Sequence, residues 1–140
     1  MKRLFILALS IFLFSCADQF IVSAKLQNQS NKKDIVAAIV VVLQENGYST
    51  EIANENIGIV NSTWKEKSKL LWVERTKMNF VFDEQNNTLK MTPFYQVHGD
   101  SGWGDDSLRD GTRDDFNKLI SQIANKLNNN IQIKWVKRNN

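Results

Sequence analysis

The segment from His98 to Asp106 holds the densest group of side chains that could do chemistry. It contains the only histidine of the chain, together with Ser101 and the carboxylates of Asp100, Asp105 and Asp106. A hydrolase could pair Ser101 with His98 and Asp100, but the members of such a triad normally come from separate elements of a fold. Ser101 also lacks the strand-to-helix turn that exposes a nucleophilic serine. We therefore predict no catalytic residues.

Metal binding is the second chemistry that this segment could support. Asp100, Asp105, Asp106 and Asp110 carry oxygens that suit calcium, but they do not fall at the alternating positions of an EF-hand loop. Zinc would have His98 as its only nitrogen ligand and no thiolate. The composition is typical of a solvated turn, with glycines at positive φ and aspartates that bond the local backbone. We predict no metal site.

Recognition of a partner is the third role, because a rigid scaffold can present such a loop. Of the four tryptophans, Trp64 and Trp72 lie in strand-like runs and are expected in the core. Trp103 and Trp135 lie in a loop and near the end of the chain, where an indole can anchor a partner. We predict a recognition loop that uses His98, Asp100, Trp103 and Asp105.

The only cysteine, Cys16, lies near the start of the chain. One thiol can form neither an internal disulfide nor a zinc cluster. Lys2, Arg3 and an apolar run over residues 4–14 precede it, which is typical of an export signal. That run has about eleven residues, whereas a membrane-spanning helix needs about 20.

The residues Leu13-Phe14-Ser15-Cys16 resemble the lipobox of bacterial lipoproteins. The resemblance implies that residues 1–15 are removed, that Cys16 carries a covalent lipid, and that this lipid attaches the protein to a membrane. Several acyl chains anchor stably, at ~0.8 kcal/mol per buried CH₂. Ala17 follows the cysteine, and Asp18 lies one place too late for the signal that retains lipoproteins in the inner membrane. We therefore expect the bacterial cell envelope, at the outer rather than the inner membrane, and no other cofactor.

The charge and length of the remaining chain limit its partners and its domain count. The chain has 18 basic and 15 acidic residues, so removal of Lys2 and Arg3 leaves it nearly neutral. A neutral domain lacks the basic surface of a nucleic-acid binder. About 125 residues remain, which is the size of one domain. We predict a signal peptide over 1–15, a lipidated N-terminus and linker over 16–32, and a single α+β domain over 33–140.

Two amphipathic helices are expected to position the recognition loop. The first follows a cap at Ser30 or Asn31 and ends at Gly47, which suits a left-handed C-terminal cap. The second begins near Thr112, with Asp115 completing a capping pair. Their apolar stripes repeat at helical spacing and consist of Ile35, Ile39, Val42 and Leu43 in the first helix, and Phe116, Leu119, Ile120, Ile123 and Leu127 in the second.

Four strand-like runs lie between the helices, at residues 48–54, 57–65, 70–83 and 88–98. The alternation in the last two predicts which residues share one face of each strand: Trp72, Glu74, Thr76, Met78, Phe80 and Phe82 in the third run, and Leu89, Met91, Tyr95 and Val97 in the fourth. Residues 99–111 read as a loop, and short strands are expected over 20–26 and 131–136. Pro93 inside the fourth run argues for an edge or a bulge. This order predicts a two-layer α+β domain, in which an antiparallel sheet of about four strands carries both helices on one face in a helix-grip-like arrangement.

Three short motifs support that arrangement by resemblance. They are Asn46-Gly47-Tyr48, Ile57-Gly58-Ile59-Val60 and Thr63-Trp64-Lys65. They resemble the helix–strand–strand opening of helix-grip lipoprotein domains, as in the BamC-type accessory lipoproteins of the outer-membrane β-barrel assembly machinery. The resemblance implies a fold and a non-enzymatic, scaffold-like role, and it assigns no binding residue.

We therefore expect a membrane-anchored envelope lipoprotein that acts as a scaffold or accessory module and binds an envelope protein. The alternative is a small-ligand-binding lipoprotein with a pocket between helix and sheet, lined by Trp72, Phe80 and Tyr95. A hydrolase that uses His98 and Asp100 is the remaining alternative.

Overall fold

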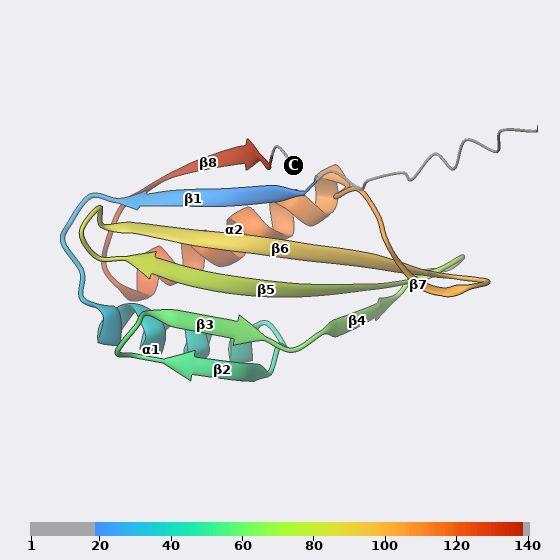
Figure 1. Ribbon diagram of the computed structural model, residues 1–140, viewed down its shortest axis with the longest axis horizontal. Helices are drawn as coiled ribbons and strands as arrows, with labels where there is room; N and C mark the ends of the chain where they lie inside the picture. The colour runs from blue at the N-terminus through green and yellow to red at the C-terminus, as the bar shows by residue number, and fades with distance from the viewer. Residues whose placement is uncertain (1–18, 139–140) are drawn as a thin grey trace, which may run out of the picture.

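One antiparallel sheet of eight strands organises the chain in the computed structural model, which describes residues 19–138. The strands follow the order β2-β3-β5-β6-β1-β8, while β4 pairs with β5 and β7 pairs with β6. Figure 1 shows the long strands β5 and β6 extending past β1 toward β4 and β7. The strands are β1 (Phe20–Leu26), β2 (Thr50–Asn54), β3 (Ile59–Ser62), β4 (Lys65–Ser68), β5 (Val73–Asp83), β6 (Thr88–Gly99), β7 (Gly102–Asp105) and β8 (Ile131–Lys137).

The predicted fold class is wrong in its strand count and in its helix arrangement. The sheet has eight strands rather than about four, and β1 lies between β6 and β8 instead of outside a simple meander. Helix α1 (Lys32–Glu45) contacts β2 and β3, whereas α2 (Asp110–Lys126) contacts β8. The two helices therefore contact different parts of the sheet, and the arrangement is not a helix grip.

Two of the missed strands have no sequence signal of their own. Strand β4 reads Lys65-Glu66-Lys67-Ser68, without an apolar alternation, and β7 is the glycine-rich Gly102–Asp105. Both are extended because they pair with the long strands β5 and β6. Tertiary pairing therefore overrides local propensity in these segments.

The helix ends agree only in part with the sequence prediction. Asn31 caps α1, and its side-chain oxygen accepts a hydrogen bond from the backbone N–H of Asp34 at 2.9 Å. Gly47, at φ 74°, follows the last turn of α1, and the Tyr48 N–H donates to the Leu43 carbonyl at 2.9 Å in a Schellman motif. Thr112 does not cap α2, which begins two residues earlier at Asp110 and has no side-chain cap.

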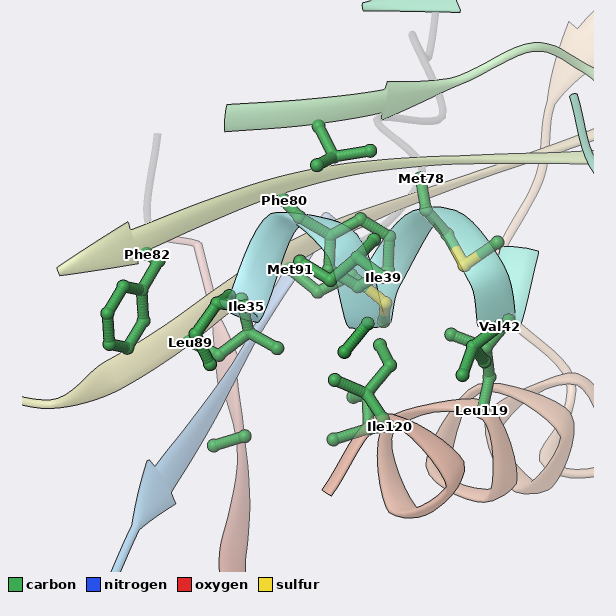
Figure 2. Packing of buried hydrophobic residues seen from close by; sticks show 14 of the residues in the cluster. Ile35, Ile39, Val42, Met78, Phe80, Phe82, Leu89, Met91, Leu119 and Ile120 are labelled. Atoms are coloured by element: carbon green, nitrogen blue, oxygen red, sulfur yellow. The ribbon is translucent and has the colours of Figure 1, made fainter. Parts of the chain in front are cut away.

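The core contains alternate residues of the central strands and the apolar stripes of both helices. On β5, Met78 and Phe80 are fully buried, and Met91 of β6 lies opposite Phe80. Figure 2 shows these side chains between the strands and the turns of α1 and α2. The predicted parity of β5 and β6 is confirmed, and so are the two helical stripes, except that Leu127 is only partly buried.

Pro93 lies inside β6 at the position where the strand lacks a second neighbour. Met78 of β5 is opposite Pro93 on one side. On the other side, the pairs with β1 end at Met91 and the pairs with β7 begin at Gln96. A proline has no N–H to donate, so it fits this gap in the ladder. Strand β6 is therefore an edge on this side only over residues 92–95, which is where the proline predicted an edge or a bulge.

Two buried asparagines hold the segment between β1 and α1. Asn87, at φ 48°, donates to the carbonyls of Leu26 and Asn28 at 3.0 and 2.8 Å. Asn129 accepts hydrogen bonds from the backbone N–H groups of Gln27 and Asn28 at 3.1 and 3.0 Å. These bonds satisfy backbone groups that would otherwise be buried without partners. The segment that the sequence predicted as a linker is thus fixed to the sheet.

No helix within residues 19–138 is both long and apolar enough to cross a bilayer. Cys16 and the predicted signal peptide lie outside the described residues.

Candidate functional site

The segment predicted as a recognition loop begins as a hairpin between β6 and β7. Gly99 pairs with Gly102, so Asp100 and Ser101 form its exposed tip. Gly102 adopts φ 100°, a conformation that favours glycine, and this closes the turn. The pairing places His98 opposite Trp103. The prediction of a continuous loop over residues 99–111 is therefore wrong for Gly99, which belongs to β6, for residues 102–105, which form β7, and for residues 110–111, which begin α2.

An arginine stacked between two indoles is the most unusual feature of this hairpin's outward face. The Arg75 guanidinium lies 4.2 Å from the ring centroid of Trp103 and 4.5 Å from that of Trp64. Its Nε donates to Oε1 of Gln96 at 2.8 Å. Stacking and hydrogen bonding together fix a side chain that is otherwise long and flexible. We call Trp64, Arg75, Gln96 and Trp103 the indole–arginine platform.

Two of the predicted recognition residues adjoin this platform. His98 packs edge-on against Trp103, with ring centroids 5.1 Å apart. Asp105 accepts a hydrogen bond from Nε2 of Gln96 at 2.8 Å. Asp100 lies apart from them, at the exposed hairpin tip. The structure thus brings together three of the four predicted residues.

Sequence reasoning missed three members of the platform. Trp64 was expected in the core, but it is half-buried against Arg75. The alternation of β5 places Arg75 on the outward face, yet only the pairing of β5 with β6 brings it beside Gln96. Trp72, also expected in the core, lies under the Arg109 guanidinium at 4.5 Å. The only sign of such a platform in the sequence was the high number of tryptophans together with an arginine, Arg75, inside a strand-like run.

The inward face of the same strands carries a buried carboxylate. Glu74 accepts hydrogen bonds from Tyr95 Oη at 3.0 Å and Trp72 Nε1 at 3.3 Å, and Lys69 lies 3.6 Å away. Burial acts to raise the pKa of Glu74, but the two hydrogen bonds and the Lys69 charge outweigh it and lower that pKa below its ordinary value. Burial and the neighbouring carboxylate raise the pKa of Tyr95 to about 12.

These pKa directions describe a structural cluster and not an acid–base pair. A general acid or base works best when its pKa lies near the working pH. Here the carboxyl group is held ionised and the phenol is held neutral, so the pKa of each group is shifted further from neutral pH. The cluster stabilises the inward face beneath the indole–arginine platform.

A small hollow lies beside α2, away from the expected pocket. Tyr48, Lys65 and Asp115 line adjoining cavities of ≈ 60 and ≈ 190 Å³. Pockets for drug-sized ligands are typically about 300–1,000 Å³. Phe80, which was expected to line a ligand pocket, is fully buried in the core instead. The hollow is therefore smaller than such pockets. A wider, open groove of ≈ 390 Å³ beside Ala38, Val41 and Leu127 also lies away from the residues expected to line a ligand pocket.

Within residues 19–138, no three histidine, cysteine or acidic side chains converge on a point that could hold a metal ion. Trp135, the other expected anchor, is half-buried and its indole makes contacts within the domain. Its Nε1 donates to Asn117 at 2.8 Å, and its ring packs edge-on against Phe20. The indole–arginine platform is thus the strongest candidate for a recognition surface.

A scan against protein-family models finds no match to this chain, and a search of curated proteins finds no similar sequence.

Proposed function

We propose that this protein is a lipid-anchored accessory module of the bacterial cell envelope, more specifically of the outer membrane, that binds a protein partner without catalysing a reaction. The lipobox resemblance at Cys16 supports the anchor. The observation that carries the binding role is the Arg75 guanidinium held between Trp64 and Trp103 on the outward face of the sheet.

The platform has the chemistry of a protein-binding surface. Tryptophan and arginine are enriched among the residues that contribute most to protein interfaces. The stacked guanidinium is already ordered, so a partner would bind it at a small cost in side-chain entropy. Asp105 and His98 add polar groups at the rim of the same patch, where they can select the partner by hydrogen bonding.

Affinity capture from detergent-solubilised membranes tests both halves of the proposal. The Cys16→Ala variant should leave the membrane fraction and lose the partners that co-purify with the wild type. The Arg75→Ala variant should stay in the membrane fraction but lose the same partners. Lys90→Ala is the matched control, because Lys90 is an exposed cation on the outward face of β6, away from the platform.

Each half fails in its own way. A Cys16→Ala protein that stays in the membrane would rule out the lipid anchor. Partners that bind Arg75→Ala as well as they bind the wild type would rule out the platform as the binding surface.

A further inference from the structure

The hairpin between β4 and β5 carries two leucines at its tip. Leu70 and Leu71 are 99% and 82% exposed, more than any other large apolar residue among those described. The Lys69 N–H donates to the Trp72 carbonyl at 2.8 Å and closes the turn beneath them. Tight hairpin turns normally carry glycine, asparagine or aspartate. A turn made of two leucines breaks that rule, and such violations mark functional sites.

The tip lies beyond the end of β1 at which the chain enters the sheet. Figure 1 shows the β4–β5 tip and the β6–β7 tip at one end of the long axis, and the start of β1 faces that end but lies well short of it. Val22 is opposite Met91, so the ladder, continued by two residues, brings Phe20 level with Pro93. Val97 is opposite Glu74 further along β6. Measured along the strand direction, Leu71 is therefore level with residue 100 of the β6 side and lies seven residues past the level of Phe20. At the rise of a strand this is about 23 Å.

Resting on the proposed lipid anchor, we propose that the Leu70–Leu71 tip inserts into the membrane that holds Cys16. Cys16 precedes Phe20 by four residues, which span at most about 14 Å. Even with that segment fully extended toward the tip, Leu71 lies at least about 9 Å beyond Cys16 along the strands. With the strands inclined to the membrane, the leucines can therefore reach the depth of about 5–10 Å at which interfacial apolar side chains enter a bilayer. The anchor and the tip would together fix the orientation of the protein.

The charged residues at this end limit the insertion to the two leucines and keep it shallow. Lys67 and Lys69 flank the leucines. Lys69 is paired with Glu74, and the long side chain of the exposed Lys67 can extend to the headgroups. Asp100 lies at the neighbouring β6–β7 tip and opposes any electrostatic attraction to anionic lipid. The leucines should therefore insert into neutral vesicles as well, with the protein tilted so that the β6–β7 tip stays in water.

An environment-sensitive fluorophore on the lipidated protein tests the insertion. In Leu71→Cys, the new thiol is the only free one once Cys16 is acylated, and mass spectrometry of the same sample reports that acylation separately. The protein is reconstituted in phosphatidylcholine vesicles that contain nitroxide-labelled lipid. Ile57→Cys is the control, because Ile57 is 55% exposed in the β2–β3 turn at the opposite end of the molecule.

We expect a blue shift and nitroxide quenching of the label at position 71, and neither at position 57 nor in Ser101→Cys. Replacing Leu70 with glutamate in the labelled protein should lower the ratio of inserted to free tip about tenfold, because one leucine leaves the apolar phase. In protein whose Cys16 carries lipid, a label at position 71 that is unquenched, or that shifts without quenching, would overturn the insertion alone. A Cys16 without lipid in the mass spectrum would overturn the proposed anchor and, with it, this proposal.

Discussion

The two ends of β5 are stabilised by different interactions. At one end, Met78, Phe80 and Phe82 are buried in a core that includes side chains of both helices. At the other end, Glu74 is fixed by hydrogen bonds on the inward face, and Arg75 is stacked between indoles on the outward face. We call these parts of the sheet the core end and the distal end, the latter comprising β4, β7 and the segments of β5 and β6 that pair with them.

The difference shows how one sheet can provide both stability and a binding surface. Apolar burial is non-directional and grows with the buried area, so the core end should contribute most of the folding free energy. Cation–π stacking and hydrogen bonds depend on orientation and contribute less per residue. They keep aromatic and charged side chains ordered while leaving them accessible, which is what recognition needs.

The largest effect should come from truncating the core end. Phe80→Ala removes a fully buried ring and should lower the free energy of unfolding by about 3–5 kcal/mol. Trp103→Ala at the distal end removes a larger side chain but should lower it by only about 1 kcal/mol, through lost stacking on Arg75. Urea denaturation of both variants measures the difference. Equal losses would show that the two ends do not differ.

A pair of glycines sharpens the same comparison at the backbone. Gly58 has φ +71°, and a Cβ there would lie 3.2 Å from the Phe82 carbonyl. Gly58→Ala should therefore cost roughly 1–2 kcal/mol from the left-handed conformation alone. Gly99→Ala at the distal end meets no atom within 4 Å and should be nearly neutral. Thermal unfolding of the two variants tests this, and a neutral Gly58→Ala would contradict it.

The platform itself should contribute a smaller but measurable stability. Arg75→Ala removes two stacking contacts and the hydrogen bond to Gln96, and we expect a loss of about 1–2 kcal/mol. Arg75→Lys should recover only part of it, because an ammonium lacks the planar face. Chemical denaturation with Lys90→Ala as control measures this. Full recovery by lysine would mean that charge, and not stacking, stabilises the distal end.

The sequence predicted the core end better than the distal end for a physical reason. The alternation around Phe80 and the helical stripe through Ile39 are local patterns, and each one reports burial directly. The cap at Gly47 is also local, because a left-handed residue follows from glycine at the end of a helix. These predictions are confirmed.

Features that depend on strand pairing could not be read locally. Nothing in residues 20–26 says that β1 lies between β6 and β8. Strand β4 is wholly polar, and β7 is glycine-rich, so neither resembles a strand. The platform depends on these pairings. For that reason the sequence indicated His98, Trp103 and Asp105 as recognition residues but did not indicate Arg75.

The smallest predicted effect is a pH dependence that belongs to the distal end. Glu74 has a lowered pKa in the folded state, so its contribution to stability is present above the unfolded pKa and is lost as the pH falls through the folded one. Tyr95 has a pKa raised from 10.0 to about 12, so its contribution is complete below pH 10 and is lost as the pH rises toward 12.

The double variant Glu74→Gln, Tyr95→Phe should therefore flatten both edges of the stability–pH curve while leaving the Phe80 core unchanged. The ultraviolet absorbance of phenolate gives an independent measurement on the wild type. Burial also raises the pKa of Tyr48, so both tyrosines of the chain should ionise late, close to alkaline unfolding. Ionisation of Tyr95 near pH 10 in a folded protein would show that the Glu74 carboxylate does not hold the phenol neutral. The distal end would then depend on arginine stacking alone.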